Sequence, residues 1–224
     1  MREFTSCAGR RQFSLLKANK ERIKPRLLAL ALKDEKPQVR SQALKTLNKY
    51  FKADADFKAA VENKLSDSSN IVKAAAFKIV AENDKNKAEQ IAKQYESSKS
   101  GDMLNAVATF YKEQGDPADN DFFLNAIDKT RRYDRFLLID TYTGYLKKID
   151  VKYWEKGIRK IGAIGAKVTA NLGTTTIRNS LDRLQDEIES RLKDPNTDKN
   201  EINELTSMKQ TLQEQINLLK KKQE

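Results

Sequence analysis

The feature that most constrains this chain is an internal repeat. The segment LKDEKPQVRSQALKTL (residues 32–47) is followed 33 residues later by LSDSSNIVKAAAFKIV (residues 65–80). Repetition at a fixed period predicts a fold built from one repeated supersecondary unit. The matched pairs are Leu32 with Leu65, Asp34 with Asp67, Val39 with Val72, Arg40 with Lys73, Ala43 with Ala76, and Leu47 with Val80.

Each unit is predicted to be a helix, a tight turn and a second helix. Apolar residues recur at helical spacing on both sides of the turn, and Pro37 suits the first turn of the second helix, where its missing N–H costs nothing. In the first unit the predicted inward faces are Ile23, Leu27, Leu28 and Ala31, and then Val39, Ala43, Leu44 and Leu47.

The polar and small repeat positions have predicted structural roles. The aspartate of each unit lies between the helices, where it can accept a hydrogen bond from a free N–H at the next helix start, worth about 1 kcal/mol. The alanine stays small where two helices cross closely. The basic residue can extend toward the aspartate of a neighbouring unit and form a polar ladder. These pairs are Asp34 with Asp67, Ala43 with Ala76, and Arg40 with Lys73.

This pattern resembles the HEAT repeat, and the resemblance implies an all-α, HEAT-like α-solenoid. A helical pair has too little apolar surface to be stable alone, so neighbouring pairs stack. Fainter pairs continue the pattern, and the chain predicts about five helical hairpins, over residues 20–194, and a C-terminal capping helix within 195–224. Asp198 and Glu201 resemble a capping box at its start. Residues 1–19 are predicted to be a basic tail or an opening helix.

Composition argues against catalysis by this chain. It has no histidine and one cysteine, Cys7, so the commonest metal ligand, the usual general base and a disulfide within the chain are all missing. We therefore predict no catalytic residue, no cofactor and no metal site. No apolar run reaches the roughly 18 residues that span a bilayer, and the N-terminus lacks the apolar region of a signal peptide, so we expect a soluble chain of unknown compartment.

The net charge of +11 is concentrated at one end. Residues 1–50 carry 13 Lys and Arg against 4 Asp and Glu, so the other 174 residues supply only +2. The run GRRQFSLLKANKERIKPR (9–26) could meet phosphates, an anionic membrane surface or an acidic partner, although a helix with a solvated basic face explains it more simply.

Two other motifs have both a functional and a structural interpretation. KTRRYDRF (129–136) places Arg131, Arg132 and Arg135 near a helix start, where they could contact phosphate or an acidic peptide, although an exposed corner between helices is the simpler account. Four glycines in GIRKIGAIGAKVTANLG (157–173) match no nucleotide-binding fingerprint. They favour close helix packing, with Gly173 ending a helix.

The run from about residue 20 to 192 also resembles the C-terminal HEAT-like region of bacterial zinc aminopeptidases of the aminopeptidase N type. The quoted motifs are KDEKPQVRSQALKTL, SDSSNIVKAAAFKI, YKEQGDPADNDFF (111–123), YWEKGIRKIGAIGA and IRNSLDRLQDEI. The resemblance implies a non-catalytic accessory domain that covers the cleft or contacts peptides, with zinc only in a catalytic domain of the parent enzyme. The zinc motif H-E-x-x-H does not occur in this chain.

Two alternatives remain open at this stage. The chain could be a stand-alone HEAT-repeat scaffold that binds a protein or peptide partner, which is the commonest role of such repeats. It could also be a basic HEAT-repeat protein that binds DNA, similar to an alkylpurine DNA glycosylase, although the local concentration of charge makes nucleic acid the weaker candidate.

Overall fold

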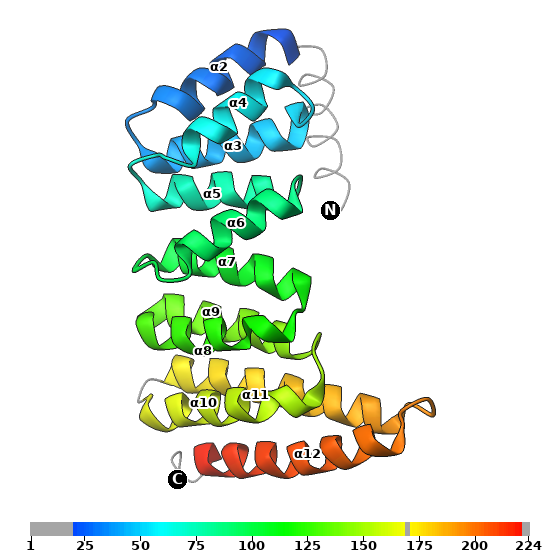
Figure 1. The fold of residues 1–224 in the computed structure, drawn as a ribbon. Helices are drawn as coiled ribbons and strands as arrows, with labels where there is room; N and C mark the ends of the chain where they lie inside the picture. Colours follow the sequence, from blue (N-terminus) through cyan, green and yellow to red (C-terminus); the bar gives the residue numbers. More distant parts are fainter. Residues whose placement is uncertain (1–19, 169–170, 221–224) are drawn as a thin grey trace, which may run out of the picture. The chain divides into compact units, whose positions relative to one another are not determined.

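The structure is a computed structural model that describes residues 20–168 and 171–220, and these residues form helices and no strand. Eleven α-helices and two short 3-10 helices account for nearly all of them (Figure 1). The chain divides into two compact units, one ending at Ile91 and the other beginning at Ala92. The predicted tail at residues 1–19 lies outside the described residues.

The N-terminal unit contains two helical hairpins that stack on each other. The first is α2 (Lys20–Lys33) with α3 (Pro37–Phe51), and the second is α4 (Ala55–Lys64) with α5 (Asn70–Ala81). Helix α2 packs on α4, and α3 packs on α5, so the two matched sequence segments lie side by side. The repeat therefore exists because each hairpin covers the apolar face of the other.

Several repeat positions are more deeply buried in the second hairpin than in the first. Val72 and Ala76 are fully buried, whereas Val39 is only half-buried and Leu32 is exposed.

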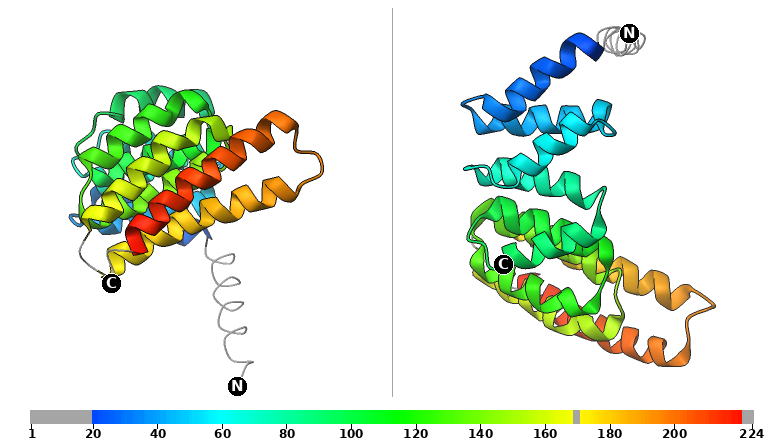
Figure 2. Two further views of the ribbon diagram at one scale, coloured as in Figure 1. Left: turned by 90° about the horizontal axis from the view of Figure 1, so that it is seen from below. Right: turned by 45° about the horizontal axis from the view of Figure 1, so that its top comes forward.

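The C-terminal unit contains the later helices, of which α11 and α12 are the longest. Helix α6 (Lys85–Tyr95) contains the boundary between the units, and α7 (Gly101–Gln114) follows it. The later elements are η1 (Pro117–Asp119), α8 (Asn120–Lys129), α9 (Arg132–Leu146), η2 (Val151–Tyr153), α10 (Trp154–Lys167), α11 (Asn171–Lys193) and α12 (Lys199–Lys220). Helix α12 packs on both α10 and α11, beside which it lies in Figure 2.

The order of helices confirms the predicted fold class. Five consecutive hairpins, α2/α3 to α10/α11, precede the closing helix α12. The core of the C-terminal unit is aromatic, because Phe123 stacks on Tyr142 and Tyr145 with ring centroids 5.1 and 4.4 Å apart. The Tyr142 hydroxyl donates to Asn120 Oδ1 at 2.6 Å, so this polar group is satisfied inside the core.

Turn residues set where several helices begin and end. Gly115 ends α7 with φ of 67°, a left-handed conformation that glycine adopts without strain. Asp116 Oδ1 then accepts from Ala118 N at 2.9 Å, and Pro117 starts η1. At α12 the carboxylate of Asp198 accepts from the backbone N–H groups of Asn200 and Glu201. The Glu201 carboxylate lies instead 3.6 Å from Arg191 Nη1, so half of the predicted capping box is present.

The prediction that Gly173 ends a helix is wrong. Helix α10 ends at Lys167, and Gly173 lies in the first turn of α11, where it contacts Val168 and Phe136. Close packing does explain the other glycines of this stretch. Gly162 and Gly165 are buried on α10 against Gln215 and Leu219 of α12, which leave no room for a Cβ.

None of the helices in the described part of the chain combines the length and the apolar character needed to cross a membrane.

We predict that Ala76→Leu destabilises the N-terminal unit, because Ala76 is fully buried on α5 where this helix packs on α3. Overpacking should cost about 1 to 3 kcal/mol in the free energy of unfolding. Thermal unfolding followed by circular dichroism measures the effect, with the exposed substitution Lys99→Glu as control. Equal melting temperatures for the two variants would contradict the placement of Ala76 at a close crossing.

Candidate functional site

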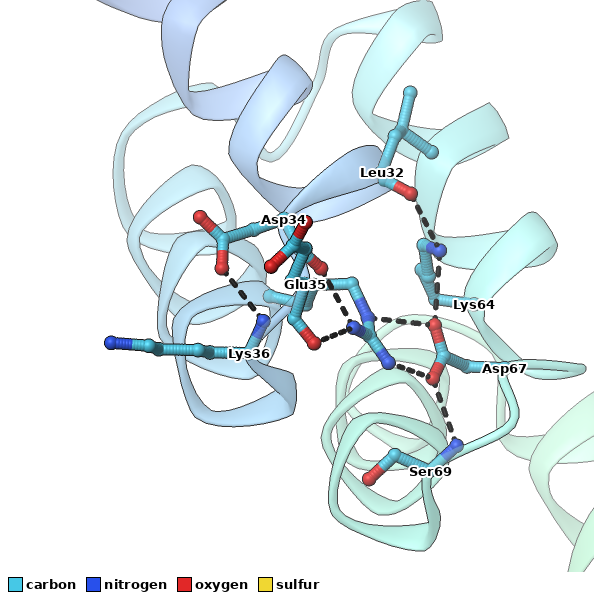
Figure 3. A network of polar contacts seen from close by, with 8 residues as sticks. Leu32, Asp34, Glu35, Lys36, Lys64, Asp67 and Ser69 are labelled. Carbon is cyan, nitrogen blue, oxygen red and sulfur yellow. Dashed lines mark hydrogen bonds and ion pairs between the residues drawn. The ribbon is translucent and has the colours of Figure 1, made fainter.

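The two hairpins of the N-terminal unit are joined by a buried ion pair between Arg40 and Asp67. Figure 3 shows the polar network around the Asp67 carboxylate. Arg40 lies in the first turn of α3, and Asp67 lies in the turn between α4 and α5. Arg40 Nε donates to Asp67 Oδ2 at 3.0 Å, and Arg40 Nη2 donates to Oδ1 at 2.7 Å. This is the two-pronged geometry in which a guanidinium binds a carboxylate most strongly.

Further donors complete the network around the Asp67 carboxylate. Lys64 Nζ donates to Asp67 Oδ2 and to the carbonyl of Leu32, both at 3.0 Å, and Ser69 N donates to Oδ1 at 2.9 Å. Arg40 Nη1 donates to the Asp34 carbonyl at 2.7 Å. The network therefore ties together the end of α2, the start of α3 and the α4–α5 turn.

The hydrogen bonds and charges of this network keep Asp67 ionised at physiological pH. The side chain of Asp67 is 4% exposed, and those of Arg40 and Lys64 are 10% and 8% exposed. Burial alone would raise the pKa of Asp67, but hydrogen bonds from Arg40, Ser69 and Lys64 outweigh it and hold this pKa far below its usual range. A carboxylate that stays ionised at every physiological pH is suited to holding two hairpins together and unsuited to proton transfer.

The first copy of the repeat lacks an equivalent network. Asp34 Oδ1 accepts from Lys36 N at 2.9 Å, as Asp67 accepts from Ser69 N, so in both copies the aspartate bonds the N–H two residues on. Lys73, the counterpart of Arg40, is half-buried. Within the described residues, no ion pair joins it to an aspartate. Of the two pairs in the predicted polar ladder, the described structure therefore contains the one between Arg40 and Asp67.

A second polar feature is a hollow of about 470 Å³ in the C-terminal unit, here named the basic corner. Its exposed cations are Lys99, from the turn before α7, Lys129, the last residue of α8, and Arg131, from the turn between α8 and α9. Tyr133, which is 75% exposed, lies on its edge. The remaining residues that line it are Gly101, Thr130 and Asp134.

The turn that carries the basic corner is held by its own hydrogen bonds. Thr130 ends α8, and its hydroxyl donates to the Ala126 carbonyl at 3.1 Å. Arg135 Nε donates to the Thr130 carbonyl at 2.8 Å, so Arg135 stabilises the turn and does not line the hollow. Of the three arginines proposed from the sequence, Arg131 lines the hollow, and the side chain of Arg132 lies outside the described structure.

Lys99 is the residue that the sequence analysis missed. It lies about one repeat before Arg131, in the preceding turn that joins the two helices of a hairpin. Successive turns of this kind occur at corresponding positions when hairpins stack, and α7 packs directly on α9. The repeat spacing could therefore have predicted that Lys99 lies near the KTRR turn.

The N-terminal unit also has a groove of about 590 Å³ beside α4. Its floor is formed by buried apolar side chains of α4 and α5, and its edge by residues of both charges, among which Lys87 pairs with Glu62 at 2.6 Å. The floor residues are Phe57, Val61, Ile79 and Val80. Across the described residues, no group of three or more His, Cys, Asp or Glu side chains could hold a metal ion.

Comparison with known proteins supports the helical repeat. Residues 53–80 match the family model of the HEAT repeat associated with sister chromatid cohesion. The match spans α4 and α5, which form the second hairpin and contain Asp67. No curated protein and no solved structure matches the chain. Together with the stacked helical hairpins, this match supports a HEAT-like helical repeat domain, and nothing in these comparisons links it to an aminopeptidase.

We predict that Asp67→Asn lowers the free energy of unfolding of the N-terminal unit by about 3 to 5 kcal/mol at neutral pH, because it leaves two buried cations without their anion. The matched control is Asp34→Asn, at the equivalent repeat position, where the side chain bonds one exposed N–H and the cost should stay below about 1 kcal/mol. Urea titration followed by circular dichroism measures both values.

The effect should depend on pH in a defined direction. Because the folded-state pKa of Asp67 lies below its unfolded value of about 4, its contribution is complete above that pH and decreases as the pH falls toward the folded-state pKa. The asparagine does not titrate, so the stability gap between wild type and Asp67→Asn should shrink below about pH 4. A gap that widens on acidification would contradict the ion-pair assignment.

Proposed function

We propose that this chain is a protein-interaction scaffold built from HEAT-like hairpins, and that it acts by holding a partner protein. The observation that carries this proposal is the HEAT-repeat match at residues 53–80, on a hairpin that stacks on its neighbour through the repeated positions. Stacked hairpins use their apolar faces for each other and leave turns and outer helix faces free for binding.

The surface features support the same role. The basic corner and the groove beside α4 are both open to solvent, and both are formed where consecutive helices meet. The matched family is named for sister chromatid cohesion, but a match over one hairpin supports the repeat and not that process. Partner identity therefore has to come from the chemistry of the surface.

A narrower hypothesis is that the scaffold serves an aminopeptidase N-type enzyme as its accessory domain. It rests on the sequence resemblance alone, of which YKEQGDPADNDFF (111–123) is the most specific part. In this stretch Gly115 and Asp116 form the turn after α7, and Phe122 and Phe123 are buried in the core. These roles serve any hairpin of this shape, so they do not favour an aminopeptidase over another partner.

The scaffold proposal predicts that the chain binds a partner protein saturably, and that this binding persists after nucleic acid is removed. The tagged full chain would be incubated with nuclease-treated lysate of its source cells, and captured proteins would be identified, purified and titrated back against the chain. We expect at least one partner to rebind with defined stoichiometry, while the tag alone retains none. If a parallel sample of untreated lysate yields only nucleic acid, with an affinity that falls steeply as salt rises, and the treated lysate yields no protein, the chain is a nucleic-acid-binding protein instead.

Chemistry by the chain itself is tested separately. We expect the purified chain to contain far less than one zinc ion per molecule by elemental analysis and to release no product from an aminoacyl reporter, because it has no histidine to build the zinc site of an aminopeptidase. Stoichiometric zinc or turnover would refute this. An H-E-x-x-H motif in the coding sequence upstream would support the narrower accessory role.

A further inference from the structure

We propose that the basic corner of the C-terminal unit binds a short acidic segment of a partner protein, in which carboxylates flank an aromatic or apolar residue. This inference rests on the proposed scaffold function and names the class of partner. It follows from the charge, the shape and the aromatic edge of the basic corner, each of which comes from residues of two neighbouring turns.

The cations of the basic corner are not in ion pairs within the described residues. Lys99, Lys129 and Arg131 are exposed, and none of them forms an ion pair within the part of the chain that the structure describes. Elsewhere in the same unit, cations pair readily across helices or along them. Examples are Lys148 with Glu113, Arg159 with Glu155, and Lys209 with Glu189. Three cations without an ion pair around one hollow therefore offer charge complementarity to an external anion.

The single carboxylate of the basic corner is already engaged. Asp134 packs against Gly101 so closely that a Cβ at position 101 would collide with its carboxyl group. This places the anion at the first turn of α7, where the positive end of the helix dipole stabilises it. Asp134 offsets one of the three positive charges, and the hollow keeps a surplus of two.

Tyr133 adds an apolar contact to this charge. Its ring is 75% exposed, the largest exposure among the exposed large apolar and aromatic side chains of the described residues. Exposed tyrosines are well suited to binding, because they present a large rigid surface with a hydroxyl at the tip. A segment with an aromatic or apolar residue between its carboxylates would cover this ring while it neutralises the cations.

A protein segment fits the basic corner better than nucleic acid. Nucleic-acid affinity depends on neutralising a succession of phosphates along the backbone. The cations here are confined to two turns, and residues 92–224 as a whole carry 23 Lys and Arg against 21 Asp and Glu. This near balance gives the C-terminal unit little long-range attraction for a polyanion.

The test compares two triple variants of equal charge. Lys99→Gln/Lys129→Gln/Arg131→Gln removes the cations of the basic corner. The control Lys156→Gln/Lys167→Gln/Lys199→Gln removes three exposed lysines that lie elsewhere in the same unit and form no ion pair with a described residue. Both are assayed by fluorescence anisotropy on the full chain, with a labelled peptide of glutamates around a single tryptophan. Circular dichroism melting of each variant shows that it is folded.

We expect the first variant to bind the peptide about tenfold more weakly than wild type, since three modest ion pairs are lost together. The control should change the affinity less than about twofold, and Tyr133→Ala should weaken binding by about threefold with all charges kept. Equal losses in the two triple variants, or no measurable binding by wild type, would overturn the proposal. Tighter binding of a DNA oligonucleotide than of the peptide, lost in the first variant, would assign the basic corner to nucleic acid.

The outcome is separable from that of the scaffold proposal. If the protein captured from lysate binds wild type and the first triple variant equally, while the acidic peptide does not bind, the acidic-segment inference is wrong and the scaffold function stands. If the chain binds no protein at all, the scaffold function fails whatever the peptide does.

Discussion

The structure depends on the fact that one amphipathic hairpin cannot bury its own apolar face. Helix α3 packs on α5, and α2 packs on α4, and Leu44, Leu47 and Phe77 are fully buried in the stacked hairpins. Stacking of this kind makes each hairpin the solvent-excluding surface of the next. It also explains why the sequence repeats, since every added hairpin needs the same pattern of apolar positions.

Apolar stacking alone leaves the register between hairpins weakly defined, and the network around Asp67 supplies a specific one. Arg40 reaches Asp67 only when the start of α3 lies opposite the turn before α5. Buried ion pairs add little net stability because desolvation offsets their attraction, but a mispaired one is costly. We interpret Arg40, Lys64 and Asp67 as a device that selects one alignment of the two hairpins. The match at residues 53–80 includes this aspartate.

Much of the fold could be predicted from the sequence, because helix spacing, Pro37 and the Asp116–Pro117 pair are local signals that survive in the folded chain. Gly173 was misread, since a glycine can end a helix or permit close approach, and only tertiary contacts with Val168 and Phe136 decide between the two. The difference in burial between Val39 and Val72 could not be predicted from the sequence either. Equivalent letters in a repeat do not reveal which copy is the more deeply buried.

The candidate site could be predicted only in part, because tertiary contacts decide which of its basic residues come together. Arg131 and Arg135 are the same residue type only four positions apart, yet one lines the hollow and the other donates to the Thr130 carbonyl. Lys99 belongs with Arg131 only through the stacking of α7 on α9. In a repeat protein the core positions are constrained by the neighbouring hairpin, whereas exposed turn residues are not. Partner recognition is therefore most readily placed at successive turns, where residues one repeat apart in sequence meet in space.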